Sequence, residues 1–289
     1  MRKIRTIAVL PTLFTLGNLV CGFFAIVVAS RVDRPLTAEP PTAVQISFQG
    51  PFGLGGFDST DPTQNAMLSG WLIFLAMIFD ALDGHVARLA RTSSDFGAEL
   101  DSLCDVVSFG VAPGFLLVAM CRSLAYSYPE AIWIIAAAVP ICAALRLARF
   151  NVESPENDDH LQFSGLPSPA AAGSIAGFAI LFYTLRQETS SQASIHQMDS
   201  IMEIWVCILA LAVSALMVSR IPYPHIVNQL FRGQRSFGHI VGVVFALVAI
   251  MVIKAYSIPL ICTLFVLGPP VRFIWQRLQQ RSTESEPMF

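Results

Sequence analysis

The sequence predicts an all-α fold, a polytopic transmembrane helical bundle of about eight spans. Hydrophobic residues make up 54% of the 289 residues and charged residues only 13%, which is about half the charged share of ordinary soluble domains. The mean hydropathy is +0.62. The apolar residues also form runs long enough to cross a bilayer, rather than the periodic stripes of soluble helices.

Eight apolar segments are expected to be helical spans. The first follows basic residues, as a secretory signal would, but its run is long for a signal and we expect it to remain as a span. The segments lie near residues 12–30, 69–89, 97–121, 130–150, 168–185, 201–219, 237–254 and 257–275. They predict a single integral membrane domain over 1–281, with an external loop at 31–67 and a polar tail at 282–289.

The distribution of basic residues predicts the orientation in the membrane. With the N-terminus inside, most lysines and arginines fall at or near the inner ends of the spans, as the positive-inside rule expects. We therefore expect a multi-pass protein of the cell (inner) membrane. Both termini and the acidic stretch 80–105 would face the cytoplasm. The lipid bilayer is an expected partner and nucleic acid is not.

Four aspartates, Asp80, Asp83, Asp101 and Asp105, stand in this otherwise apolar stretch. Residues three or four apart share one face of a helix, so each pair of aspartates lies on one face of its own helix. A short polar turn between the two helices would aim all four carboxylates at one point. Ionised carboxylates in an apolar region are costly unless they are neutralised, and the two arginines nearby cannot balance four charges. The stretch therefore predicts a divalent metal site.

The spacing of these residues forms a complete motif. It reads Asp80-x2-Asp83-Gly84-x2-Ala87-Arg88-x8-Gly97-x3-Asp101-x3-Asp105. This pattern resembles the signature of the CDP-alcohol phosphatidyltransferase family. Acids that line a transport path, or that are salt-bridged to arginines, are the alternative, but such acids would not need small residues at these offsets.

The acids have a physical reason for their place in this motif. Asp80, Asp83 and Asp101 supply the hard oxygen ligands that suit Mg²⁺ or Mn²⁺, and two ions a few ångströms apart can hold a pyrophosphate. Asp105, the last acid on its face, can accept the proton of an attacking hydroxyl. The resemblance implies the same roles, with Asp105 near the metal ions as the general base.

Small and basic residues around the acids suit the CDP moiety and its phosphates. Residues without bulk let a flat pyrimidine or a phosphate lie against the helix, and an arginine can bind phosphate oxygens bidentately. The residues expected to do this are Asp83, Gly84, Ala87, Arg88 and Gly97. Thr15 and Asn18, in the first span, could reach the nucleotide or phosphates, or could make polar packing contacts.

Further segments indicate which acceptor alcohol the protein uses. The runs PTLFTLGNLVCGFFAI (11–26), DVVSFGVAP (105–113), ALRLARFNV (144–152) and FSGLPSPAAAG (163–173) resemble the membrane-embedded phosphatidylserine synthases of bacteria and archaea. The resemblance implies a six-helix core, a homodimer, and transfer of the phosphatidyl group from CDP-diacylglycerol to L-serine with release of CMP. Arg146, Arg149 and Asn151 are candidates to bind the serine, although the arginines could also be membrane anchors of the inner loop.

Two other functions stay open at this point. A sister enzyme would use the same donor with glycerol phosphate, inositol phosphate or choline, and the lipid part of the donor could be closer to an archaeal lipid. The more distant alternative is a non-enzymatic membrane carrier whose acids form an ion path.

Overall fold

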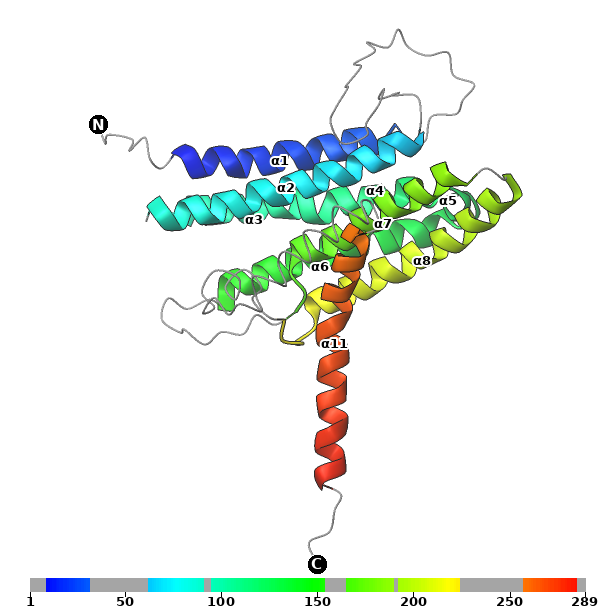
Figure 1. Cartoon of the computed structure of the whole chain (residues 1–289). Coiled ribbons are helices and arrows are strands. Elements are labelled where there is room, and N and C mark those ends of the chain that lie inside the picture. Colours follow the sequence, from blue (N-terminus) through cyan, green and yellow to red (C-terminus); the bar gives the residue numbers. More distant parts are fainter. Residues whose placement is uncertain are drawn as a thin grey trace, which may run out of the picture.

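The described part of the chain is helical. A computed structural model describes residues 9–31, 62–90, 95–153, 165–189, 192–223 and 257–284, and for these residues the all-α prediction is confirmed (Figure 1). The elements are α1 Val9–Ala29, α2 Pro62–Ala90, α3 Asp95–Val106, the short π-helix η2 Val107–Val111, α4 Ala112–Met120, α5 Arg122–Ser127, α6 Pro129–Glu153, α7 Ser168–Glu188, α8 Gln192–Val218 and α11 Ser257–Glu284.

Six of the predicted spans are present among the described residues. They are Thr12–Ala29, Gln64–Val86, Phe96–Met120, Pro129–Val152, Ser168–Arg186 and Gln197–Val218. The predicted segment 237–254 lies outside the described residues. The predicted segment 257–275 is part of α11, but its apolar stretch, Ile261–Arg272, is shorter than a span. The structure therefore supports a multi-pass membrane protein with six spanning helices in its described part.

Two predicted boundaries differ from the structure. The external loop was expected to run to residue 67, but α2 already begins at Pro62. Proline is favourable in the first turn of a helix, where its missing N–H is not needed, so the polar residues ahead of the apolar run are helical. The polar tail was expected from residue 282, but α11 continues to Glu284.

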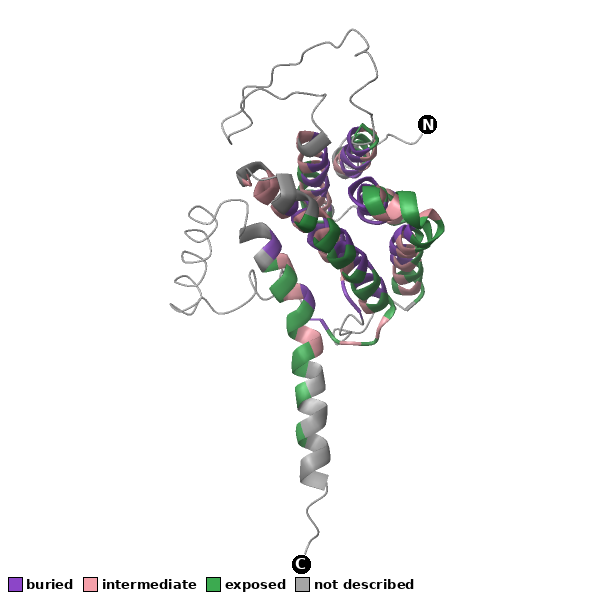
Figure 2. Ribbon diagram, turned by 90° about the vertical axis from the view of Figure 1, so that its right-hand side faces the viewer, coloured by how far each residue is buried: buried purple, intermediate pink, exposed green. Residues whose placement is uncertain are grey.

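The third and fifth spans form the centre of the bundle. In each of them 67% of the residues are buried, against 28–39% in the other four. α1 packs along α2, α2 contacts α7, α6 packs against α8, and α11 lies against α7. Figure 2 shows the buried residues facing inward and the exposed ones facing outward. The outer faces carry exposed large apolar side chains such as Phe23, Trp133 and Trp205, which suits contact with lipid tails.

Small residues allow the central helices to approach closely. Four alanines of α7, namely Ala171, Ala172, Ala176 and Ala179, are fully buried. A Cβ added to Gly114 of α4 would lie 2.8 Å from the carbonyl oxygen of Ala136 in α6, which is too close for any side chain. Association of helices in membranes depends on such close packing, because the hydrophobic effect does not drive helices together in lipid.

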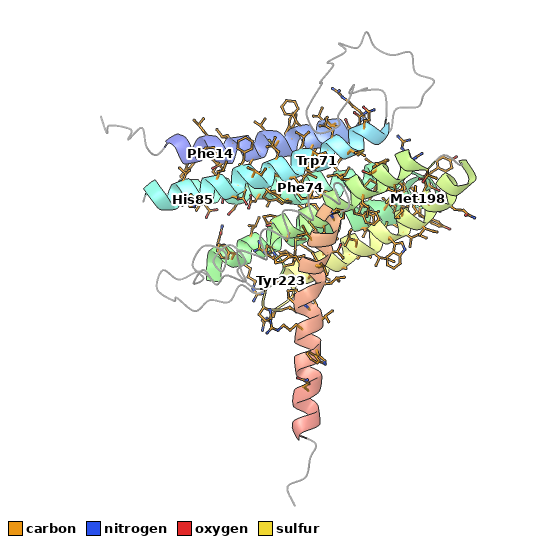
Figure 3. The ribbon with its side chains drawn as sticks, in the orientation of Figure 1. Phe14, Trp71, Phe74, His85, Met198 and Tyr223 are labelled. Carbon is orange, nitrogen blue, oxygen red and sulfur yellow. The ribbon has the colours of Figure 1, made fainter. Side chains whose placement is uncertain are left out.

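The bundle has two distinct ends. Figure 3 shows His85, near the end of α2, and Met198, near the start of α8, at opposite ends of the helices. The end with His85 also holds the start of α3 and the last turns of α6 (Figure 1). Tyr223, which follows α8, donates a hydrogen bond from its hydroxyl to the carbonyl oxygen of Val266 (3.0 Å) and so joins this part of the chain to α11.

The contact between α1 and η2 gives a test of this packing. A Cβ at Gly22 would lie 2.3 Å from Oγ and 2.7 Å from Cα of Ser108, so backbone as well as side chain would have to move. We expect Gly22→Ala to lower the free energy of unfolding by about 1–3 kcal/mol, as overpacking of a tight core does. Thermal unfolding of the purified protein in detergent measures the change.

Gly268→Ala is the matched control, because a Cβ at this α11 glycine would meet no atom within 4 Å. Equal unfolding temperatures for the two variants would show that α1 does not pack on η2 in this way.

Candidate functional site

The aspartates of the motif meet where α2 and α3 lie together. Asp80 of α2 and Asp101 and Asp105 of α3 each offer a carboxylate oxygen, and these oxygens lie within 4.8 Å of one another. Asp83 lies close enough to interact electrostatically with Asp80 and Asp101. The helical spacing in the sequence thus places all four acids in one site.

The site is sheltered from solvent. Asp83 and Asp105 are each only 7% exposed, and Asp80 and Asp101 are half-buried. Two like charges at such separations repel by a few kcal/mol even at an effective dielectric constant of about 20. The protein therefore has to offset this repulsion with hydrogen bonds or with a cation.

Two side chains of α1 donate hydrogen bonds to the acids. The hydroxyl of Thr15 donates to Asp83, and the amide of Asn18 donates to Oδ1 of Asp105 at 3.0 Å. Both donors are buried, at 3% and 0% exposure. The sequence left open whether Thr15 and Asn18 bind nucleotide or make polar packing contacts. The structure shows them holding two of the carboxylates in place.

Some polar atoms of the site have no partner in the protein. Oδ1 of Asp101 and Oδ1 of Asn18 are buried and accept no hydrogen bond. Buried polar atoms are nearly always satisfied, so these oxygens suit a bound group. Carboxylate oxygens are the ligands that Mg²⁺ and Mn²⁺ prefer, and three of them already converge. The donor set fits a divalent cation.

A π-helical turn follows Asp105 directly. η2 comprises Val107–Val111, and its residues Ser108, Phe109 and Gly110 are buried. Ser108 donates its hydroxyl to the backbone carbonyl of Asn18 (3.0 Å), so the same turn fixes the residue that holds Asp105. Short π segments inside helices are frequent at functional sites. The sequence does not predict this turn, because residues 97–121 form one continuous apolar segment.

Arg146 of α6 lies beside the acids. It interacts electrostatically with Asp105, and its Nη1 donates to the hydroxyl oxygen of Ser168 in α7 (3.1 Å). Its Nε is buried and has no hydrogen-bond partner. Arg146, one of the three expected acceptor residues, is therefore joined to the aspartate site through Asp105.

The other two expected acceptor residues lie further along α6. Arg149 is half-buried. Asn151 is exposed, and its amide donates to the hydroxyl of Ser102 at 3.2 Å. Because Ser102 follows Asp101 directly, this contact holds the end of α6 against the acid-bearing helix.

The small and basic residues of the motif are described in part. Gly84 is exposed, and a Cβ there would meet no atom within 4 Å, so there is open space beside α2. Gly97, on the first turn of α3, is half-buried. Ala87 and Arg88 lie in α2, but their side chains fall outside the described residues.

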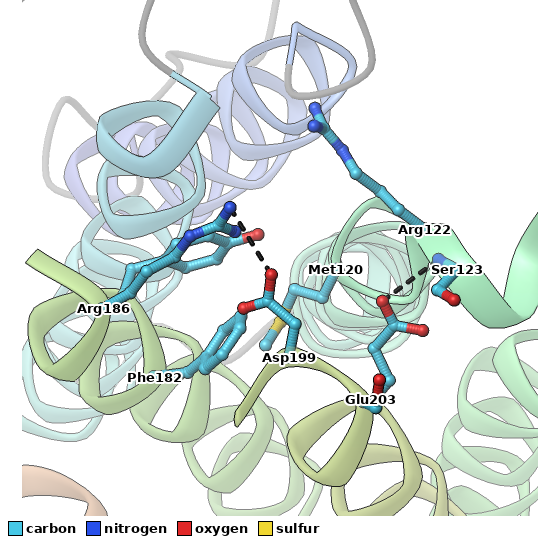
Figure 4. A pocket seen from close by; sticks show the side chains of 9 residues that line it. Met120, Arg122, Ser123, Phe182, Arg186, Asp199 and Glu203 are labelled. Atoms are coloured by element: carbon cyan, nitrogen blue, oxygen red, sulfur yellow. Dashed lines mark hydrogen bonds and ion pairs between the residues drawn. The ribbon is translucent and has the colours of Figure 1, made fainter. Parts of the chain in front are cut away.

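A second polar site lies at the opposite end of the bundle (Figure 4). It is a cavity of about 160 Å³ between the ends of α4 and α7 and the start of α8. Its Glu203 accepts the backbone N–H groups of Ser123 (3.1 Å) and Leu124 (2.8 Å) and so caps α5. Arg186 pairs with Asp199 at 3.5 Å. Oδ1 of Asp199 is buried without a hydrogen-bond partner, but Asp199 pairs with an arginine and Glu203 caps a helix, which indicates a structural role.

Glu203 is a residue that sequence reasoning missed. It is 5% exposed, and its sequence signal is a lone acid at the start of an apolar span. Within the part of the chain that the structure describes, Asp80, Asp101 and Asp105 form the one group of three acidic, histidine or cysteine side chains close enough to share a metal ion. The aspartate site is therefore the candidate for chemistry.

Comparison with known proteins gives consistent matches. The family model for CDP-alcohol phosphatidyltransferase matches residues 8–218. The chain is 40% identical over 161 residues to the CDP-diacylglycerol–serine O-phosphatidyltransferase of Methanocaldococcus jannaschii, which covers 55% of this chain and 65% of that protein. It is 42% identical over 106 residues to the protein of the same name from Helicobacter pylori J99 (37% and 43%). It is 35% identical over 158 residues to the archaetidylserine synthase of Methanothermobacter thermautotrophicus (54% and 57%).

These alignments span roughly four tenths to two thirds of the relatives' own lengths. The family match covers well over half of this chain and includes α1 to α8 with all four aspartates. The chain belongs to the CDP-alcohol phosphatidyltransferase family, as the resemblance in its motif implied.

The crowding of the acids predicts an unusual response to mutation. In the absence of divalent cations, Asp101→Asn relieves repulsion among the carboxylates. We expect it to raise the unfolding temperature of the protein in chelator, by about 2–4 °C for each kcal/mol relieved. Mg²⁺ or Mn²⁺ should stabilise the unmodified protein strongly and the variant weakly, as thermal unfolding with added cation would measure.

Asp199→Asn serves as the control, because this acid pairs with Arg186 at the other end of the bundle. It should not raise the unfolding temperature in chelator, and it should keep the response to cation. An Asp101→Asn variant that is less stable in chelator and responds normally to cation would contradict a metal site here.

Proposed function

We propose that this member of the family transfers the phosphatidyl group of CDP-diacylglycerol to the hydroxyl of L-serine, giving phosphatidylserine and CMP. The observation that carries the proposal is the meeting of Asp80, Asp101 and Asp105 with a half-buried arginine, Arg146, at their side. The acids suit the reaction class, and the arginine suits an acceptor with a carboxylate. The names of all three relatives described above contain serine, which supports this acceptor.

Asp105 is the proposed general base. One of its oxygens is held by the amide of Asn18, which leaves the other to accept the proton of the serine hydroxyl. The serine oxygen then forms a bond to the phosphorus that carries diacylglycerol. The bond from that phosphorus to the CMP oxygen breaks, and CMP leaves with the electron pair. Because Asp105 is buried, little water competes with serine for the phosphorus.

The remaining acids are the proposed cation ligands. Asp80, Asp83 and Asp101, with Asp105, would hold Mg²⁺ or Mn²⁺, as two ions. When bound, such ions neutralise the carboxylates and stabilise negative charge on the pyrophosphate oxygens. The hydrogen bond from Thr15 fixes the orientation of Asp83.

The donor nucleotide is placed beside the acids in this proposal. Gly84 and the open space next to it would admit the cytidine or its phosphates, together with Ala87 and Gly97. Arg88 would bind phosphate oxygens. The single domain, the orientation toward the cytoplasm in the cell (inner) membrane and the homodimer expected from the sequence remain part of the proposal.

Arg146 is the proposed ligand of the serine carboxylate. It lies next to the base, so a serine bound there would carry its hydroxyl toward the reacting phosphorus. Its buried Nε lacks an acceptor, and arginine binds carboxylates through two parallel N–H groups. Arg149 and Asn151 lie one to two turns further along the same helix and would border the entrance.

An assay with a panel of acceptors tests the proposed function. Purified protein would be given CDP-diacylglycerol with L-serine, glycerol phosphate, inositol phosphate or choline, and CMP release would be measured. We expect turnover with serine and little with the others, because the buried Nε of Arg146, beside Asp105, suits a carboxylate, and phosphorylated acceptors favour several cations. Turnover with a phosphorylated alcohol in place of serine would replace this function with that of a sister enzyme. If no CMP is released with any of these acceptors, the non-enzymatic membrane carrier would be favoured.

The role of Asp105 gives a separate prediction. Asp105→Asn keeps the shape and the hydrogen-bond capacity of the side chain but cannot accept the proton. We expect kcat to fall about 10²–10⁴-fold, the usual contribution of a general base, with a small change in the KM for serine. Turnover close to that of the unmodified enzyme, in protein that is monodisperse and folded, would remove Asp105 as the base.

A further inference from the structure

The turn before α7 is tied to the end of α8. The N–H of Gly165 donates to the carbonyl oxygen of Ile221 (2.9 Å), and the N–H of Leu166 donates to that of Leu216 (3.0 Å). Leu216 belongs to the last turn of α8, and its carbonyl oxygen also accepts hydrogen bonds from the N–H and the hydroxyl of Ser219. The turn thus docks on the end of one helix while it starts the next.

Gly165 is required for this docking. Its φ of +94° lies in the left-handed region, which side chains other than glycine rarely adopt. A Cβ there would also lie 2.4 Å from the carbonyl oxygen of Met217 and 2.9 Å from that of Ser219. The backbone of the turn can therefore lie directly on the end of α8 only with glycine at this position.

Ser168, the first residue of α7, is placed by this turn. Serine near a helix start commonly caps its own helix, but α7 begins after Pro167 and has no side-chain cap. The hydroxyl oxygen of Ser168 instead accepts the hydrogen bond from Nη1 of Arg146, across to α6. Ser168 is fully buried.

The bond to Ser168 leaves Arg146 incompletely satisfied. A serine hydroxyl is a neutral acceptor and uses one of the five N–H groups of the guanidinium. Nε remains buried and without an acceptor. A half-buried cation held in this way suits an anionic ligand with two parallel acceptor oxygens, which a carboxylate provides.

We infer that the turn Gly165–Ser168 is the positioning element for acceptor selection. Ser168 orients the guanidinium of Arg146 so that its remaining N–H groups donate hydrogen bonds to the carboxylate of a small hydroxy amino acid. Gly165 sets where Ser168 stands, by docking the turn on α8. Ser168 is a positioning residue that acts through Arg146, and the inference rests on the proposed function. It makes selection of the acceptor depend on a contact between α6 and α7, outside the aspartate motif.

A matched pair of variants tests the inference. Ser168→Ala removes the hydroxyl that holds Arg146. Ser174→Ala removes another buried hydroxyl of α7, which bonds only within its own helix, to the carbonyl oxygen of Ala171 (2.7 Å). We expect the first variant to raise the KM for L-serine about tenfold, the effect of losing one hydrogen bond to a charged group. Its kcat and its KM for CDP-diacylglycerol should change little. The control, Ser174→Ala, should match the unmodified enzyme in kcat and in the KM values for both substrates.

Ethanolamine, which is serine without its carboxylate, supplies a second readout. The preference for serine over ethanolamine, as a ratio of kcat/KM values, should fall in Ser168→Ala and stay unchanged in Ser174→Ala. Gly165→Ala should lower the preference at least as far, because it displaces the whole turn. A general loss of packing would lower activity with both acceptors and leave the ratio unchanged.

The outcomes separate this inference from the proposed function. An unmodified enzyme that releases no CMP with serine overturns the proposed function and this inference with it. Serine turnover in the unmodified enzyme, with an unchanged serine KM and an unchanged preference in Ser168→Ala, overturns the role of the turn alone.

Discussion

The cost of four carboxylates inside an apolar bundle governs the arrangement of the helices around them. α1 contributes little charge of its own, yet its two buried polar side chains, Thr15 and Asn18, both point to an aspartate. They can reach because α1 lies very close to η2, where a Cβ at Gly22 would touch the backbone of Ser108. The hydrogen bonds to the acids thus depend on the close contact of small residues. Without that contact, Thr15 and Asn18 would be too far from the aspartates.

The two ends of the bundle show how structural and chemical acids differ. Glu203 gives both of its oxygens to backbone N–H groups and so completes a helix start. Asp101 and Asp199 each keep a buried oxygen without a hydrogen-bond partner. Asp199 pairs with Arg186 through its other oxygen, whereas Asp101 lies a few ångströms from two other carboxylates. A buried acid that is fully satisfied by the protein has no capacity left for a ligand. An unsatisfied oxygen among crowded carboxylates destabilises the fold unless something binds, and this is the condition for a site that depends on a cation.

The parts of the site that follow from helical periodicity were predictable from the sequence. Asp80 and Asp83, like Asp101 and Asp105, are three or four residues apart, so local geometry alone places each pair on one face. The contact of Arg146 with Ser168 was not predictable, because 22 residues separate them and the contact depends on how the turn docks on α8. The π turn after Asp105 and the cap formed by Glu203 also depend on tertiary packing, for which the local sequence carries no periodic signal.

In the proposed mechanism, the residues that act on the donor and the residues that select the acceptor stand on different helices. The aspartates stand on α2 and α3 and are held by α1, whereas Arg146 stands on α6 and is oriented from α7. The two sets meet where Arg146 lies beside Asp105. A change in the α6–α7 contact can therefore alter the alcohol that is accepted and leave the cation ligands undisturbed. This separation is a physical reason why one aspartate motif can serve enzymes that differ in their acceptor.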